Sequence, residues 1–326
     1  MHKTGIIGVG KYLPKRVLTN AELEKMVDTT DEWIVTRTGI KERRIADENE
    51  AASDMAYKAA MNALDNAGLK PEDIELIIVA TITPDMFFPS TACQLQHKLG
   101  IINVPAFDIS VACSGFVYGL AIADQFIKTG MYKRALVVAA EKLSAVTNWT
   151  DRSTCVLFGD GAGAAVLGRV DEGGILGVHL GADGTQGDLL KLPAGGSRMP
   201  ATKHTVENNL HTIQMEGNTL FKHAVKIMAE AAKAVTEPLG LTGDDIDIII
   251  PHQANLRILN ALAKRMGVDP EKKVYLNIDK YGNMSAASSA IALCEAVETG
   301  RIQKGNIILM DAFGGGLTWG ALIIKW

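Results

Sequence analysis

Short runs of consecutive apolar residues alternate with longer Ala-rich segments along this sequence. The runs are typical of strands buried on both faces of a sheet, and the segments at 53–67, which is rich in Ala, and at 115–129 have the length of helices. The pattern predicts an α/β fold with parallel strands, in which ligands bind beyond the carboxyl ends of the strands. The predicted strands are 74–80, 106–110, 135–140 and 248–251.

Part of this pattern occurs twice. Residues 68–78 are similar to 240–250, and 134–138 are similar to 306–310, in each case with a displacement of 172 positions. Similarity repeated at one displacement favours a duplicated fold over chance.

The repeat predicts two similar halves, 1–170 and 171–326, each a sheet with helices packed on it, related by a pseudo-twofold axis. The same displacement carries Cys113 onto Ser285. The alternative is a single doubly wound sheet with coincidental similarity, because acidic turns before Ile/Val strands are common in α/β proteins.

The composition is that of a compact globular protein, with 47% hydrophobic and 21% charged residues. A net charge of −4, and the lack of a long apolar run or secretory signal, predict a cytoplasmic protein that binds neither nucleic acid nor membrane. The cysteines are far apart, which argues against both disulfides and a zinc site. They are Cys93, Cys113, Cys155 and Cys294.

Cys113 lies where a predicted strand turns into a helix that begins with small residues. At a helix N-terminus, unpaired backbone N–H groups and the macrodipole favour the thiolate, which attacks thioesters well. The hypothesis is therefore a nucleophilic cysteine, and a buried structural cysteine is the alternative.

Two polar side chains of the second half are predicted to face Cys113. His252 follows the strand 248–251, and Asn283 comes two positions before the counterpart of Cys113, so the two helix starts should meet near the axis. A lone histidine is weak evidence, and an Asn before a helix is most often an N-cap. The glycine-rich loop 313–320 can offer N–H donors to an oxyanion, although a turn is its simpler interpretation.

Seven segments form an ordered set, namely TDEWIV at 30–35, RTGI at 37–40, DR at 151–152, FGDGAGA at 158–164, PHQAN at 251–255, GN at 282–283 and the loop 313–320. Together they resemble β-ketoacyl-acyl-carrier-protein synthase III, a family of condensing enzymes, and the resemblance runs essentially end to end. It implies a thiolase-like α/β fold of two duplicated βαβ-type halves, layered α-β-α-β-α. It also implies an acyltransferase that initiates fatty-acid synthesis by decarboxylative Claisen condensation of a short acyl-CoA with malonyl-acyl-carrier protein. No cofactor is implied, because acyl-CoA is a substrate.

By this resemblance Cys113 takes the acyl group, and His252 and Asn283 hold the carbonyl of the malonyl thioester. Decarboxylation builds negative charge on that oxygen, and two neutral donors can stabilise it without changing protonation. The backbone N–H groups of Cys113 and Gly315 would form the oxyanion hole of acyl transfer. Phe313 would favour CO₂ departure by crowding the carboxylate with apolar surface.

The resemblance also implies a CoA site. Trp33 and Arg152 match the pair that sandwiches the adenine, with Arg37 in the same binding region, and Asn255 matches a residue that lines the pantetheine tunnel. The alternatives are a half-buried core Trp, a salt bridge from Arg152 to Asp151, and plain packing.

Other implied roles concern the acyl chain and the protein partners. Phe158 would lie near the acyl pocket, and Phe88 would reach the pocket of the other subunit in a homodimer. A basic cluster would dock acidic carrier protein, although a solvated helix face is the alternative for part of it. The cluster is Lys222, Arg257, Lys264 and Arg265. Met284 departs from the family pattern, which has a small hydroxyl residue there.

Four other kinds of protein share part of the pattern. A cysteine hydrolase would also have a His well after Cys113 and then an Asn, but the duplication argues against it. A thiolase would need a second catalytic cysteine, whereas Cys294 lies within a predicted helix, and an elongating synthase would have His in place of Asn283. A silent scaffold that binds CoA or carrier protein is opposed by the intact Cys, His and Asn. The starter acyl chain, and the choice between primary and specialised metabolism, stay open.

Overall fold

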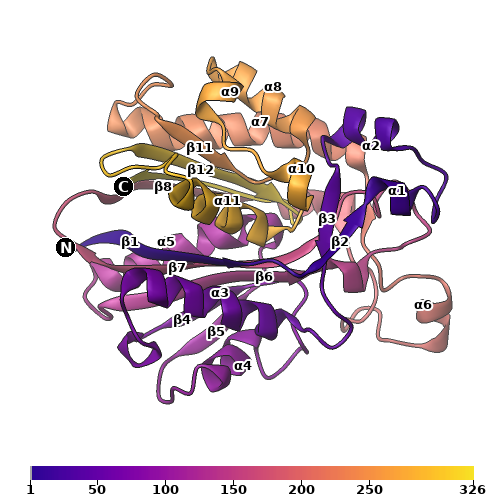
Figure 1. Ribbon diagram of the computed structural model, residues 1–326, viewed down its shortest axis with the longest axis horizontal. Coiled ribbons are helices and arrows are strands. Elements are labelled where there is room, and N and C mark those ends of the chain that lie inside the picture. Colours follow the sequence, from indigo (N-terminus) through magenta and orange to yellow (C-terminus); the bar gives the residue numbers. More distant parts are fainter. Residues whose placement is uncertain (1) are drawn as a thin grey trace.

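Residues 2–326, which a computed structural model describes, form five layers in which two sheets alternate with three layers of helices (Figure 1). The first sheet has the strand order β1-β7-β6-β4-β5 and the second has β11-β12-β13-β8. The predicted α/β fold with α-β-α-β-α layering is confirmed.

The sheets are mixed. β4 pairs in parallel with β5 and β6, and β11 does so with β12, but the other pairs in these two sheets are antiparallel. The predicted strands, β4, β5, β6 and β11, each have a parallel neighbour, whereas β1, β7, β8 and β13 pair only antiparallel. Parallel neighbours need a crossover of a dozen or more residues, whereas only 315–317 join β12 to β13. The first sheet comprises β1 Lys3–Tyr12, β4 Ile77–Ala80, β5 Ala106–Ile109, β6 Arg134–Lys142 and β7 Asp160–Val170, and the second β8 Gly174–Ala182, β11 Ile248–Pro251, β12 Ile307–Gly314 and β13 Thr318–Lys325.

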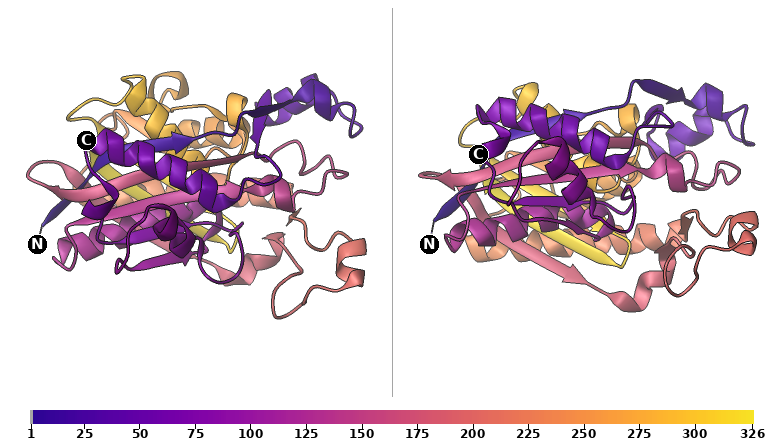
Figure 2. Two further views of the ribbon diagram at one scale, coloured as in Figure 1. Left: turned by 60° about the horizontal axis from the view of Figure 1, so that its bottom comes forward. Right: turned by 90° about the horizontal axis from the view of Figure 1, so that it is seen from below.

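The helices cover the sheets according to their composition. α5 Gly115–Lys128 and α11 Ala286–Glu298 lie between the two sheets (Figures 1 and 2). α11 is buried on nearly every side, which suits its run of small and apolar residues. The outer layers contain α3 Ala52–Ala67 and α4 Thr91–Lys98 on the first sheet, and α7 Gly217–Thr236 and α8 Leu256–Met266 on the second.

The observed helix bounds agree closely with the predicted ones, but β4 begins later than the expected strand at 74–80. Pro71–Asp73 forms a 3-10 turn that ends with a hydrogen bond from Ile74 N to Pro71 O. The chain enters the sheet only after this turn. The strand therefore starts at Ile77.

The same strand order occurs in both sheets. β1-β7-β6-β4 of the first corresponds to β8-β13-β12-β11 of the second, while β5 has no partner, because α10 Ile278–Tyr281 occupies the corresponding part of the sequence. The proposed boundary between 170 and 171 falls in the connection from β7 to β8 and stays a prediction.

Small elements gather at one end of the molecule. Both chain ends lie at the opposite end, and β4, β6 and β11 run from that end toward α1, α2 and α6 (Figures 1 and 2). The carboxyl ends of the parallel strands therefore face the end where these elements project. The elements are β2 Arg16–Thr19, α1 Asn20–Leu23, α2 Asp31–Thr38, β3 Glu42–Ile45, β9 Leu190–Lys191, α6 Lys203–Glu207 and β10 Gln214–Met215. The short helix α9 Pro270–Lys273 lies elsewhere, beside α8 and the segment before β11, where Lys273 Nζ donates to Gly243 O at 2.7 Å.

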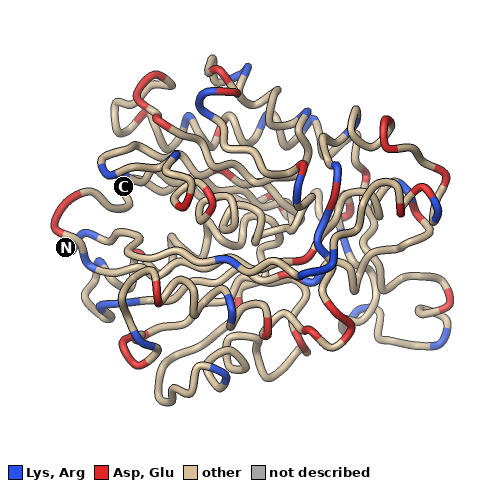
Figure 3. Tube along the Cα trace, viewed as in Figure 1, with Lys and Arg blue, Asp and Glu red and all other residues tan. Residues whose placement is uncertain are grey.

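Basic and acidic residues are interspersed along the whole trace (Figure 3). A mixed distribution agrees with the small net charge. Across residues 2–326, no helix combines the length and the apolar character that crossing a membrane requires.

Candidate active site

Cys113 lies in a 3-10 turn, Ala112–Ser114, that links β5 to the start of α5. Ala112 holds this turn with a φ of 44°, in the left-handed region, which costs a side-chain-bearing residue about 1–2 kcal/mol. The sulfur is poorly accessible, because Cys113 is 8% exposed.

The expected thiolate is not the resting state of Cys113. Burial is the main cause that raises the pKa of this thiol to about 12; the hydroxyl of Ser285 opposes the rise, and the Glu141 carboxyl makes a smaller contribution to it. Desolvation disfavours the charged form more than the helix N-terminus was expected to favour it. Cys113 therefore rests as a neutral thiol and must lose a proton during attack.

The glycine loop lies directly against the nucleophile. A side chain on Gly314 would lie 2.6 Å from Cys113 N, so only glycine allows this approach. Ser114 Oγ donates to Thr318 O at 3.1 Å, and Thr318 Oγ1 lies 3.1 Å from the carbonyl of Val111. These bonds fix the loop that contains Gly315 to the turn that contains Cys113.

His252 follows β11 and is held by its backbone, whose N–H donates to Asp311 O at 2.7 Å. The ring is buried, and burial lowers the pKa of His252 to about 4, with a backbone contact at Ser285 opposing the shift. The imidazole is therefore neutral near pH 7. A neutral ring can donate a hydrogen bond without first changing its charge.

Asn283 is oriented by its own chain. Its backbone pairs with Leu157 and Gly159, and its side-chain Oδ1 accepts from Ser285 N at 2.9 Å. Since Oδ1 is occupied, the side-chain NH₂ is the group left to donate to a ligand. Asn283 is not the N-cap residue, because Ser285 occupies the N-cap position of α11.

The structure brings the two helix starts together, as predicted. The turn that contains Cys113 contacts α11, and Gly115 packs so closely that an added side-chain carbon would lie 3.2 Å from Ala286 Cβ. Ser285 lies beside both the Cys113 thiol and the His252 ring. Groups from both sequence halves thus surround one sulfur.

The family comparisons agree with this geometry. Residues 107–184 match the model of 3-oxoacyl-[acyl-carrier-protein (ACP)] synthase III, and residues 237–326 match the model of its C-terminal part. The beta-ketoacyl-[acyl-carrier-protein] synthase III of Caldanaerobacter subterraneus is 64% identical, covering 99% of this chain and 97% of that protein.

The chain belongs to the synthase III family. It is an acyltransferase of the condensing-enzyme class with a thiolase-like fold. The crystal structure of the Aquifex aeolicus synthase III superposes with a TM-score of 0.92 at 52% identity, covering 99% of this chain and 100% of that one. The priming β-ketosynthase of the R1128 polyketide pathway gives the same TM-score at 38% identity, covering 99% and 96%.

The residues assigned to CoA by family resemblance cluster around Trp33. The guanidinium carbons of Arg37 and Arg152 lie 4.9 and 5.1 Å from the centroid of its ring. Arg152 donates to Asp28 O at 2.6 Å rather than pairing with Asp151, whose carboxylate accepts from Ser153 and Thr154. Trp33 is half-buried against an apolar cluster, as the alternative interpretation expected, and a ring in this position with two planar cations beside it also suits a nucleotide base.

Asn255 has a structural function that its motif did not reveal. It is the N-cap of α8, where its Oδ1 accepts from Arg257 N at 2.9 Å, and its Nδ2 donates to Arg37 O at 3.0 Å. This amide joins α8 of the second half to the end of α2.

The aromatic side chains assigned to the acyl chain differ in exposure. Phe158 is buried beside Asn283, with which its backbone forms an isolated bridge, and Phe313 packs in an apolar cluster with Leu317. Phe88 is 85% exposed. Met284, the departure from the family pattern, packs in the core with its sulfur beside Gly161.

The predicted basic cluster lies on two helices in contact. Lys222 is on α7, the other three residues are on α8, and all four are exposed. Arg257 additionally lies 5.6 Å from the ring of Phe221. The helices therefore present the four cations on one part of the surface.

Sequence reasoning missed three residues around the sulfur. Gly314 sets the approach of the loop, Thr318 fixes that loop, and Glu141 is a buried carboxyl that influences the thiol. The sequence did contain one indication of Glu141. An acidic residue near the end of a run of buried strand residues is unusual, because burying a carboxylate costs free energy.

Proposed function

We propose that this synthase III uses Cys113, His252 and Asn283 to condense a short acyl-CoA with malonyl-acyl-carrier protein through an acyl-cysteine. The observation that carries the proposal is the convergence of one thiol, one neutral imidazole and one oriented carboxamide from two halves of the chain. The product is a 3-ketoacyl-acyl-carrier protein, the first intermediate of fatty-acid synthesis.

In the first half-reaction, Cys113 Sγ attacks the acyl-CoA carbonyl and CoA leaves. The tetrahedral oxygen would be held by the backbone N–H groups of Cys113 and Gly315. The contact between the glycine loop and Cys113 N supports this assignment, because it fixes both donors before the substrate binds.

In the second half-reaction, malonyl thioester loses CO₂ and its carbanion attacks the acyl-cysteine. His252 and Asn283 would donate to the thioester oxygen, on which the charge develops. A histidine with a pKa of about 4 remains neutral, and the Asn283 Oδ1 is already occupied, so both groups are ready to donate. Phe313 would crowd the departing carboxylate with apolar surface.

The remaining assignments are proposals of the same kind. Trp33, Arg37 and Arg152 would bind the adenine end of CoA, Asn255 would line the pantetheine tunnel, and Phe158 would border the acyl pocket. Carrier protein would dock on Lys222, Arg257, Lys264 and Arg265, which are exposed on adjoining helices.

We further propose a homodimer in the cytoplasm that needs no resident cofactor. Phe88 would enter the acyl pocket of the other subunit. Phe88 is 85% exposed in the single chain and the adjacent Phe87 is 80% exposed, and two exposed neighbouring aromatic rings favour a surface that a second subunit covers. All four cysteines are free thiols, as a reducing compartment favours. The thioester substrates themselves supply the activated carbonyls.

Intact-mass measurement tests this scheme in two steps. After exposure to short acyl-CoAs, the protein should gain one acyl group, which peptide mapping places on Cys113. Malonyl-acyl-carrier protein should then discharge the adduct as a 3-ketoacyl product. Loss of the adduct to water alone would contradict the proposal and favour a hydrolase.

The CoA site has a separate test. Replacing Trp33 by Ala removes the ring against which Arg37 and Arg152 lie, and it should raise the KM for acyl-CoA about tenfold, because such contacts contribute about 1–2 kcal/mol. The turnover rate should change little, since the lost contact binds substrate and transition state equally. The matched control is Trp149→Ala, at a ring that donates to Ser144 O instead. An unchanged KM would refute the assignment.

A further inference from the structure

Glu141 is a fully buried carboxyl that the scheme above does not use. It lies near the end of β6, and its Oε2 accepts from Thr83 Oγ1 at 2.7 Å, Ile82 N at 3.1 Å and Thr81 Oγ1 at 3.3 Å. Its Oε1 shares only the Ile82 N–H, at 3.3 Å, so this oxygen has capacity for another donor.

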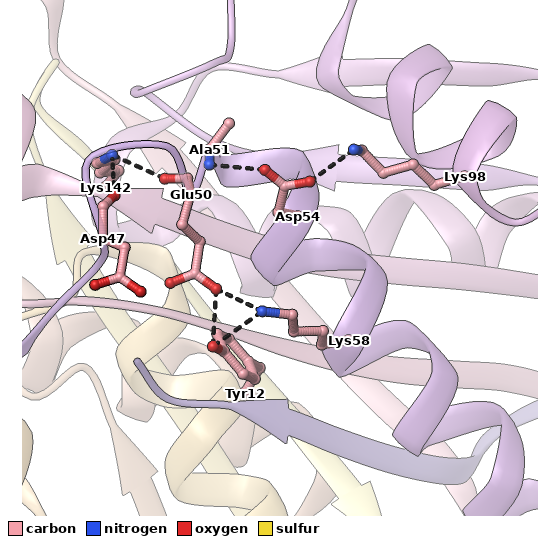
Figure 4. A network of polar contacts seen from close by, with 8 residues as sticks. All are labelled: Tyr12, Asp47, Glu50, Ala51, Asp54, Lys58, Lys98 and Lys142. Carbon is pink, nitrogen blue, oxygen red and sulfur yellow. Dashed lines mark hydrogen bonds and ion pairs between the residues drawn. The ribbon is translucent and has the colours of Figure 1, made fainter. Parts of the chain in front are cut away.

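The surroundings keep Glu141 fixed and without a cation. The next residue, Lys142, donates its backbone N–H to Thr83 Oγ1 at 2.8 Å and its amine to backbone carbonyls between 47 and 50 (Figure 4). Successive strand residues point to opposite faces, and Ala139 belongs to the core between the sheets. Glu141 therefore faces the central layer, while the ammonium of Lys142 lies on the outer face.

Ser285 connects this carboxyl to the nucleophile. It is 2% exposed, and its hydroxyl has no regular hydrogen-bond partner within residues 2–326. Ser285 stands at the start of α11, which contacts both the turn that contains Cys113 and strand β6, which contains Glu141. From there the hydroxyl acts to lower the pKa of the Cys113 thiol and of Glu141, against the burial that raises both. The backbone of Ser285 has a φ of 49°, in the left-handed region that favours glycine. This residue therefore places its hydroxyl here in spite of backbone strain.

We propose that Ser285 and Glu141 form a proton relay that activates Cys113, an inference that rests on the acyl-cysteine chemistry proposed above. As Sγ attacks the thioester carbonyl, its proton passes to Ser285 Oγ while the hydroxyl proton of Ser285 passes to Glu141. The bond from Sγ to the acyl carbon forms, and the bond from that carbon to the CoA sulfur breaks. Glu141 then returns the proton through Ser285 to the departing CoA thiolate.

The relay meets a need that His252 cannot. The thiol has a pKa of about 12, and an imidazole with a pKa of about 4 is a poor acceptor for its proton. Burial raises the pKa of Glu141 to about 7, against the opposing hydrogen bonds from Thr83, Ile82 and Thr81 and the influence of the Ser285 hydroxyl, so the carboxylate is a competent base near neutral pH. Cys113, Glu141 and the neutral His252 are the titratable groups with which Ser285 interacts. Cys294 and Glu295 lie farther along α11, burial raises the pKa of the Asp311 carboxyl on β12 well above its usual range, and Lys142 faces away.

The test measures acyl transfer to Cys113 by rapid quench and intact mass, as a function of pH, in the full-length protein and two variants. In the unmodified protein the rate should rise as Glu141 ionises and level off above pH about 7, because the proton is then accepted internally. Glu141→Gln and Ser285→Ala should each slow transfer about 10²-fold at neutral pH. In both variants the plateau above pH about 7 should disappear, and the rate should continue to rise as the pH approaches the pKa of the thiol.

Two comparisons separate a relay from other effects. If Glu141 acted only through its charge, Glu141→Gln would lower the pKa of the thiol and speed acyl transfer, which would overturn the proposal. The two variants should also be non-additive, so that the double variant is no slower than either single one, because each breaks the same chain of proton transfers.

Matched controls address packing. Glu295→Gln alters another buried carboxyl of the central layer, which accepts from Tyr281 and Asn277, and Ser289→Ala removes a buried hydroxyl of α11 that contacts only Ala286 O. Both should keep the pH profile of the unmodified protein. Thermal unfolding of all variants establishes that they are folded, and Ser285→Ala leaves the hydrogen bonds from Thr81, Ile82 and Thr83 to Glu141 in place.

A second reagent keeps the relay separable from the proposed function. Alkylation of Cys113 by iodoacetamide needs no acyl-CoA, and its rate should show the same levelling in the unmodified protein and the same loss in both variants. If acyl-CoA fails to acylate the protein while alkylation shows this pattern, the proposed function fails and the relay stands. If acylation proceeds and neither readout responds to the variants, the relay alone is wrong.

Discussion

Cys113→Ala is expected to abolish both the acyl adduct and the condensation product, with a loss on the order of 10⁶ in rate, as is typical when a covalent nucleophile is removed. Decarboxylation of malonyl-acyl-carrier protein should persist, because His252 and Asn283 keep their contacts at Asp311 and Ser285. Intact mass measures the adduct, and release of CO₂ measures the second activity.

Cys155→Ala is the matched control for this variant. Cys155 is also a buried thiol whose pKa burial raises, to about 11, but it packs in a separate apolar cluster with Ile34 and Leu143. The Cys155→Ala protein should accept the acyl group and catalyse condensation at the same rates as the unmodified protein. A Cys113→Ala protein that condensed at full speed would end the assignment of the nucleophile.

The convergence of the site could be predicted because it depends on features that are local in sequence. Cys113 and His252 each follow a recognisable buried strand, and the repeat relates Asn283 to the neighbourhood of Cys113. Strand ends of a layered α/β fold meet at one edge, so the pattern and the duplication together predicted that the start of α11 meets the turn that contains Cys113.

The chemistry of the thiol could not be predicted in the same way. Its pKa depends on burial by the Gly314 loop and on Glu141 and Ser285, which approach it only through the packing of two sheets. A helix N-terminus is visible in sequence, whereas desolvation is a property of the assembled layers. The direction of the shift was therefore wrong although the residue was placed correctly.

Strand direction shows a related limit. The runs at β4, β6 and β12 are equally apolar whether their neighbours are parallel or antiparallel, so hydrophobicity alone does not distinguish β7 and β13. The short connection from β12 to β13 contained the relevant information, because residues 315–317 cannot span a crossover.

Asn283→Asp is expected to give the opposite separation of activities from Cys113→Ala. The substitution preserves an oxygen that can accept from Ser285 N, so the turn before α11 should be retained, but it replaces the donating NH₂ with a second carboxylate oxygen. The negative carboxylate would repel the charge that develops on the thioester oxygen. Condensation should therefore fall by at least about 10²–10³, the usual effect of losing one oxyanion donor.

The measurement starts from acyl-enzyme prepared in advance and follows its discharge by malonyl-acyl-carrier protein. The adduct on Cys113 should form in the Asn283→Asp protein, because Cys113 and the glycine loop are unchanged. Asn148→Asp is the matched control, since its Oδ1 also accepts the backbone N–H two residues later, at 3.0 Å from Thr150 N. If Asn283→Asp discharged the adduct as fast as this control, the carboxamide would have no part in the carbanion step. His252 would then have to stabilise the charge on the thioester oxygen without Asn283.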